Sequence, residues 1–349
     1  MAEMPYVRRV QRVGSGTLTV SLPRKWVEKS GLKPGDVVSI VEMSDATLKL
    51  ETRPNRSAQH TVLTLDVSKI RDRELLTRLI IGAYLQGYEE INVIGGDGIS
   101  EEVQSAIAST VDMLPGVEIV EQSLRRVVIQ SFLDPSKFPV QGIIKRMQVM
   151  LTMGINTLIE ALKDGKKDTL IDIAKMESKV DELYFLCIRQ IFHSVKKEVW
   201  GEEASDPYIA AIGDRLVVRA LEEMADSLKL AADEVEKLLN SKISQALLNK
   251  LVRHLESAQV LFGKTMKAFL SLDISLANEV INTTTQEYGE EMAFNDIFTH
   301  GVNDLNTAVS LRNFVYNVVN LVRNCKIVAE VTMNRFVRTP SKLITVEKA

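Results

Sequence analysis

Apolar residues recur with helical spacing through the C-terminal part of the chain, from about residue 140 to residue 337. In the first stretch they fall about every 3.6 residues, the spacing of one helix face, at Ile143, Ile144, Met147, Met150, Leu151, Ile155, Leu158 and Leu162. Glycines, asparagines and short polar segments separate further predicted helices at 169–197, 207–239, 241–272, 275–300 and 303–337. The pattern predicts an all-α body made of two groups of three helices.

The N-terminal segment has a different pattern, in which apolar and polar residues alternate. Alternation over short stretches predicts strands, here at 7–13, 17–22, 37–41 and 47–50. A short helix is expected at 24–30, because Pro23 can start it and Gly31 can end it. Residues 51–60 are polar and contain a proline, which is typical of a linker.

After the linker, strand and helix patterns alternate in a β-α-β-α-β-β order. The predicted elements are strands at 61–65, 91–94, 117–121 and 125–132, with helices at 73–86 and 101–113. The glycine-rich turn at 95–98 lies between a strand and a helix, as phosphate-binding loops do. It lacks the P-loop lysine and the dinucleotide-binding spacing, so we interpret it as a plain turn.

These patterns predict a multidomain α+β protein with four parts. We expect a small β head at 1–53, a small α/β unit of unknown role at 60–134, and three-helix bundles at 140–239 and 241–337. The chain has 349 residues, of which 45% are hydrophobic and 26% charged, as in ordinary globular proteins. No apolar run is long enough to span a membrane and no signal peptide is apparent, so we expect a cytoplasmic protein. Cys187 and Cys325 lie in apolar helical stretches and are expected to be free, buried thiols.

The head is basic although the whole chain has a net charge of -3. Its first 36 residues hold seven basic and three acidic side chains, which leaves a local charge of +4. Such a patch is typical of proteins that bind polyanions, although a solvated basic face has the same composition.

Residues 16–38 resemble the AbrB-type swapped-hairpin domain. They contain a glycine turn, a strand that ends at Pro23, a short basic helix, and the sequence Gly31-Leu-Lys-Pro-Gly-Asp36. The resemblance implies an intertwined homodimer that contacts DNA through basic side chains, and four short strands could not enclose a core alone. The second strand carries less charge than the family pattern. The residues that match the family's DNA contacts are Arg8, Arg9, Arg12, Arg24 and Lys25.

Two acidic pairs stand out within the predicted helices. Glu177 and Asp181 are four residues apart, and so are Glu222 and Asp226, so each pair lies on one helix face. Two carboxylates so placed repel each other, and a cation between two facing helices would remove that repulsion. The alternative is a solvated polar face, where such pairs are common.

The helical body resembles the PhoU family. The likeness rests on the segments Arg219-Ala-Leu-Glu-Glu-Met-Ala-Asp226 and Glu177-Ser-Lys-Val-Asp-Glu-Leu183 and on the repeat of three-helix groups. It implies a role in phosphate uptake and a metal site at Glu177, Asp181, Glu222 and Asp226. The metal could be Fe, Zn, Mg or Mn, since carboxylate oxygens suit hard cations best. In the second bundle the corresponding residues are Thr283, Glu287, Asn320 and Asn324, so we expect a weakened or empty site there.

An AbrB-like head on a PhoU-like body is the arrangement of archaeal phosphate-uptake regulators. It implies a dimeric DNA-binding regulator of phosphate uptake with a metal-binding sensor body. One alternative is an adaptor that does not bind DNA and instead contacts a phosphate transporter or sensor. A metal-dependent bundle enzyme is a further alternative, but the Glu-x-x-His motif is absent beside these acids, and we expect no enzymatic activity.

Overall fold

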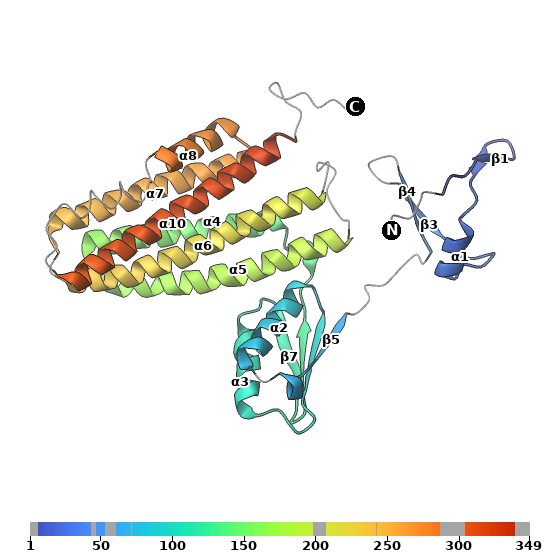
Figure 1. The fold of residues 1–349 in the computed structure, drawn as a ribbon, viewed down its shortest axis with the longest axis horizontal. Coiled ribbons are helices and arrows are strands. Elements are labelled where there is room, and N and C mark those ends of the chain that lie inside the picture. Colours follow the sequence, from blue (N-terminus) through green and yellow to red (C-terminus); the bar gives the residue numbers. More distant parts are fainter. Residues whose placement is uncertain are drawn as a thin grey trace. The chain divides into compact units, whose positions relative to one another are not determined.

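The computed structural model describes residues 6–42, 47–52, 61–70, 72–197, 207–241, 243–286 and 304–338. The chain forms two compact units, residues 1–59 and residues 60–349 (Figure 1). Residues 43–46, between the predicted strands at 37–41 and 47–50, and most of the predicted linker lie outside the described residues. In the described part of the chain, no helix is both long and apolar enough to cross a membrane.

The head consists of two hairpins and one short helix. Strands β1 (Gln11–Val13) and β2 (Thr17–Thr19) pair antiparallel, and so do β3 (Ser39–Glu42) and β4 (Leu48–Glu51). Helix α1 (Arg24–Ser30) begins after Pro23 and ends at Gly31, whose φ of 68° is the left-handed conformation that glycine adopts without strain. The four strands predicted for the head are present in the predicted order. The first two are shorter than the 7–13 and 17–22 predicted, because alternation continues beyond the residues that pair.

None of the described head residues with an assigned exposure is buried within a single chain. Large apolar side chains remain open to solvent, among them Val7 at 85% exposure and Leu18 at 68%. A two-stranded hairpin needs a further layer to cover its apolar face. The head therefore presents apolar surface that a single chain does not cover.

The α/β domain has helices packed on one face of a four-stranded sheet. The strands are β5 (Val62–Asp66), β6 (Glu90–Ile94), β7 (Val117–Gln122) and β8 (Arg126–Ser131), and the helices are α2 (Arg73–Leu85) and α3 (Glu101–Asp112). The order in the sheet is β5-β6-β8-β7, with β5 and β6 parallel and the other neighbours antiparallel. The β-α-β-α-β-β prediction is confirmed. A core that includes Leu76, Ile80, Tyr84 and Ile129 lies between sheet and helices.

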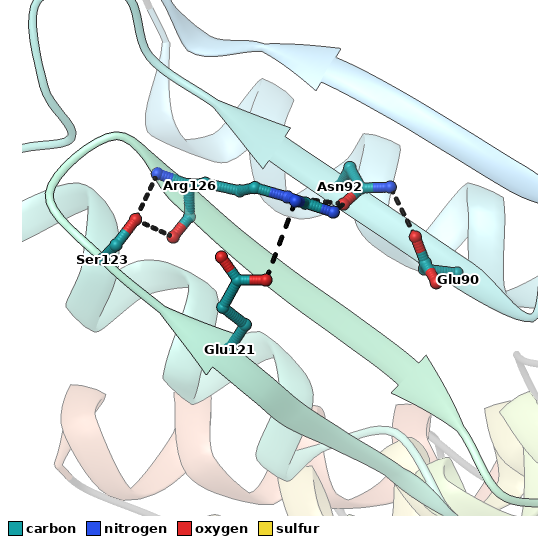
Figure 2. A network of polar contacts seen from close by, with 5 residues as sticks. All are labelled: Glu90, Asn92, Glu121, Ser123 and Arg126. Atoms are coloured by element: carbon teal, nitrogen blue, oxygen red, sulfur yellow. Dashed lines mark hydrogen bonds and ion pairs between the residues drawn. The ribbon is translucent and has the colours of Figure 1, made fainter.

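A polar network lies on the other face of this sheet (Figure 2). Arg126 donates from Nε and Nη2 to Oδ1 of Asn92, at 3.1 and 2.8 Å, and pairs with Glu121 at 3.7 Å. Asn92 in turn donates to Glu90 at 2.7 Å. The network joins three strands, so the buried amide of Asn92 keeps its hydrogen-bond partners.

The glycine turn before α3 uses several of its backbone donors internally. The N–H of Gly95 donates to the carbonyl of Arg125, Gly98 donates to Gly95, and Ile99 donates to Leu124. A Cβ added at Gly95 would lie 3.0 Å from the carbonyl oxygen of Gly98, so the turn is tight at that residue. These contacts agree with the interpretation of a structural turn.

The helical body contains the predicted helices. They are α4 (Val140–Asp164), α5 (Leu170–Lys197), α6 (Pro207–Asn240), α7 (Gln245–Ser271), α8 (Ile274–Gln286) and α10 (Leu305–Phe336). Short 3-10 turns precede α4 at Pro135–Lys137 and α5 at Lys167–Thr169, and another follows β5 of the α/β domain at Val67–Lys69. Residues 287–300 of the predicted fifth helix lie outside the described residues. α6 and α10 lie side by side along most of their length, and one continuous core connects the two groups of three helices (Figure 1).

The α/β domain contacts the body at α5. Arg189 of α5 is buried and donates hydrogen bonds to the carbonyls of Tyr84 and Tyr88 and to the hydroxyl of Ser131. Its guanidinium also lies 4.7 Å from the centre of the Tyr84 ring. Phe185, one turn before Arg189, packs against the α/β core. Helix α5 therefore contributes side chains to both domains.

Candidate metal centre

Three of the four predicted metal ligands lie together on α5 and α6. Asp181, Glu222 and Asp226 each offer a carboxylate oxygen, and these oxygens lie within 4.8 Å of one another. The helices that carry them are in contact along the body. The acidic faces of the two helices thus lie side by side.

Apolar neighbours fix this arrangement. Val180, which precedes Asp181, is fully buried, and so are Leu221, Met224 and Ala225 around the second pair. A helix whose apolar face is buried in a core must direct the flanking positions towards the groove beside its neighbour. The acids consequently lie partly buried at the α5–α6 contact.

Burial makes these carboxylates hard to ionise. It raises the pKa of Asp181 to about 6, and the charges of Glu177 and Asp226 add to the effect. Burial raises the pKa of Glu222 to about 7, although Arg219 acts in the opposite direction. The pKa of Asp226 is raised as well, by burial first and then by the charges of Glu177 and Glu223. All three shifts reflect poor solvation and mutual repulsion of negative charge.

Two oxygens of this cluster have no hydrogen-bond donor in the described part of the chain, Oδ1 of Asp181 and Oε2 of Glu222. Buried polar atoms are normally paired, and an exception calls for a cause such as an ion. Three carboxylates with raised pKa values, two of which have a buried oxygen without a donor, fit a hard cation such as Mg, Mn or Fe, and also Zn.

Glu177, the fourth predicted ligand, is not part of this cluster. Its Oε1 accepts an ion-paired hydrogen bond of 3.0 Å from Nζ of Lys229, which lies on α6 three residues beyond Asp226. Glu222 has a basic neighbour too, because Arg219 donates to it at 2.8 Å and also binds Glu223. Neither ion pair was predicted from the sequence: Arg219 was noted only as part of the PhoU-like segment, and only the packing of α5 on α6 brings Lys229 to Glu177.

The corresponding positions of the second bundle are less acidic. Asn320 and Asn324 lie one turn apart on α10, and the amide of Asn324 donates to the carbonyl of Asn320 at 3.0 Å. Thr283 lies on α8, and Glu287 lies outside the described residues. The weakened second site stays a prediction.

The five predicted DNA contacts lie in the head. Arg12 is on β1, Arg8 and Arg9 precede that strand, and Arg24 and Lys25 form the first turn of α1. All five are exposed. Arg24 has an exposed ion pair of 2.8 Å with Glu28, which is a weak interaction because solvent screens it.

Comparisons with known proteins find one match in the head and another in the helical body. Residues 144–235 match the family model of the PhoU domain. The carboxylate triad on α5 and α6 lies within this PhoU-like segment. Residues 11–59 match a second model, described as antidote-toxin recognition MazE, bacterial antitoxin.

A solved structure shares the fold of the body. The crystal structure of PhoU from Pseudomonas aeruginosa aligns with a TM-score of 0.50 and 17% sequence identity, covering 57% of this chain and 95% of that one. No curated protein matches the chain at a significant level. At this identity the likeness to PhoU shows a common fold.

Proposed function

We propose that the protein is a dimeric, DNA-binding regulator of phosphate homeostasis whose PhoU-like body binds a metal ion. The proposal rests on one observation, which is that a basic head without a core of its own and a PhoU-like body with a carboxylate triad occur in one chain. The body would sense phosphate status through a metal-bound anion or through contact with a transporter. No enzymatic activity is part of the proposal.

The head supports both dimerisation and DNA binding. Its exposed apolar side chains, such as Leu18, need a partner surface, and a second copy of the head offers a self-complementary one. Basic side chains on and around β1 and at the start of α1 can contact phosphates of the duplex. Since the ion pair of Arg24 with Glu28 is exposed, a phosphate can replace Glu28 at small cost.

The carboxylate triad supports the metal part of the proposal. Asp181 of α5, with Glu222 and Asp226 of α6, would hold the ion. A bound cation would neutralise their repulsion and join the two helices. Because each ligand must be ionised, metal affinity should rise as the pH increases through the raised pKa values of Asp181 and Glu222.

Fluorescence anisotropy with duplex DNA tests the head. The double variant Arg24→Ala and Lys25→Ala should weaken binding and reduce the slope of log K against log salt by about two, one unit for each lost phosphate contact. A matched control is Lys166→Ala with Lys175→Ala, two exposed lysines of the body. Unchanged affinity and slope in the head variant would refute the DNA-binding assignment.

A second candidate is an adaptor that acts through protein–protein contact. It is favoured by the match of the head to an antitoxin model and by the apolar surface of the head, since both also fit recognition of a protein. In that case the wild-type protein would bind no duplex DNA at low salt, where non-specific electrostatic binding is strongest.

A further inference from the structure

Lys229 lies at the edge of the carboxylate cluster. Its ammonium pairs with Glu177, the predicted ligand that is not part of the cluster. Its Nζ is 3.0 Å from Oε1 of Glu177, and the pair joins α6 to α5. The Glu177 side chain is only 13% exposed, whereas that of Lys229 is 41% exposed. The lysine therefore neutralises an enclosed carboxylate while its own side chain can still swing into solvent.

Glu177 and Asp181 lie one helical turn apart, so the paired acid is next to the triad. Electrostatic coupling agrees with this geometry. Hydrogen bonding to Glu177 raises the pKa of Lys229, and the charge of Asp226 raises it further. In the other direction, the charge of Lys229 acts to lower the pKa of both Asp181 and Asp226. Lys229 thus acts on the whole cluster as a cation attached to the chain.

We propose that Lys229 is a built-in counter-ion that competes with the metal for the cluster. In the metal-free protein it holds Glu177, and when a metal ion binds to the triad it leaves, which frees Glu177 as a further oxygen ligand. This inference rests on the metal binding proposed above. It assigns a regulatory role to a side chain of this chain, because Lys229 would set the metal concentration at which the body responds.

The role predicts opposite effects on the two states of the protein. Removing the positive charge leaves Glu177 without its ion pair and weakens the compensation of the neighbouring triad, on which Arg219 still acts, so the metal-free body should lose stability. The same change removes the charge that a metal must displace, so metal affinity should rise. A lysine with only a structural role would stabilise the metal-free and metal-bound protein alike.

The experiment compares the full-length wild type with Lys229→Met, which keeps the aliphatic stem and removes the charge. Mn²⁺ binding is titrated calorimetrically at pH 8, above the raised pKa values of Asp181 and Glu222. The melting temperature is measured in the absence of metal. We expect Lys229→Met to bind Mn²⁺ about tenfold more tightly, an effect of the order of one unit charge near a partly exposed site, and to melt at a lower temperature without metal.

Lys175→Met is the matched control, because Lys175 is 69% exposed and pairs with Asp172 on the outer part of α5. It should change neither quantity. A second variant, Lys229→Met with Glu177→Gln, should lose most of the gain in affinity, since it lacks the freed ligand.

Each outcome decides a different point. Tighter binding in Lys229→Met, or binding in that variant alone, supports the inference. Equal affinities overturn it and leave the metal site standing. Absence of Mn²⁺, Fe²⁺ and Zn²⁺ binding in both proteins overturns the inference together with the metal part of the proposed function.

Discussion

Arg189 donates a hydrogen bond of 3.1 Å from Nη2 to the main-chain carbonyl of Tyr88, and so connects the helical body to the α/β domain. Another of its nitrogens binds the carbonyl of Tyr84, in the last turn of α2. The Tyr84 carbonyl also accepts from the N–H of Gly87 at 3.0 Å, so Arg189 is a second donor to it, and a cation at the end of a helix suits the helix dipole. The body thus supplies a cap for a helix of the neighbouring domain.

Arg189→Leu should loosen the joint between the helical body and the α/β domain, which these hydrogen bonds form. The Tyr88 carbonyl would lose the donor that Arg189 supplies, whereas the Tyr84 carbonyl would keep the N–H of Gly87. A loss of about 2 kcal/mol should accelerate amide exchange around residues 84–88 roughly thirtyfold if exchange follows opening of the joint. Hydrogen exchange with mass spectrometry measures this directly. Arg215→Leu is the control, because Arg215 is exposed and lies over Phe192 within the body. Equal exchange in both variants would show that the joint does not depend on Arg189.

Asp214→Ala should destabilise the body by about 3 kcal/mol. Asp214 is buried and accepts hydrogen bonds from Arg335 and, at 3.2 Å, from Gln141, so its loss leaves a largely enclosed guanidinium unpaired. Asp214→Asn keeps an acceptor oxygen and should cost less. Urea denaturation followed by circular dichroism compares the two. A loss below about 0.5 kcal/mol in the alanine variant would contradict the assigned role.

The metal-free body should be less stable at pH 8 than at pH 5. Asp181 and Glu222 have folded-state pKa values of about 6 and about 7, above those of unfolded chains, so the folded state binds more protons between pH about 4 and 7. Stability contributed by the protonated acids is therefore complete below pH about 4 and is lost as the pH rises through 6 and 7. Solvent screening limits the effect to about 1 kcal/mol for each group.

Melting temperatures between pH 4 and pH 9 test this dependence. The double variant Asp181→Asn with Glu222→Gln should flatten the profile and raise the stability at pH 8, because it removes the repulsion. A wild-type profile that is flat across this range would mean that the acids are well solvated. Saturating metal should restore most of the stability that is lost at pH 8, because the metal binds the folded state alone.

Leu18→Glu should break the proposed head dimer and abolish most of the proposed DNA binding. Leu18 is exposed in one chain and lies opposite Arg12 in the β1–β2 pair, so a dimer partner is expected to cover it. A charge in a covered apolar site costs several kcal/mol. Light scattering gives the mass, and anisotropy gives a loss of affinity of more than about tenfold. Leu124→Glu, at an exposed turn of the α/β domain, is the control. A Leu18→Glu protein that stays dimeric and binds DNA normally would refute the proposal that a partner head covers Leu18.

Periodicity was sufficient to predict the helical body. Residues such as Ile144, Met147 and Leu151 are fully buried on one face of α4, as their spacing indicates. Helix ends were readable where glycine takes the left-handed conformation, as at Gly165. Strand ends in the head were not, since alternation continues past the paired residues and pairing depends on a partner that the sequence pattern does not identify.

The candidate site was predictable only in part. Spacing places Asp181 and Glu222 on helix faces, but their proximity depends on how α5 packs on α6. The pairing of Lys229 with Glu177 crosses the two helices and leaves no local signal. Arg189 stands beside Gln190 in a largely apolar helical run, and nothing in that run indicates that it binds another domain. Tertiary packing decides which polar residues acquire such roles.

Metal content measured by plasma mass spectrometry is the most direct test of the carboxylate triad. The wild type, Glu222→Gln and the control Glu160→Gln, an exposed acid on α4, are loaded with metal at pH 8 and dialysed. The account predicts about one or more ions per chain in the wild type and in the control, and a large loss in Glu222→Gln. A metal-free wild type, or an equal metal content in all three proteins, would contradict it.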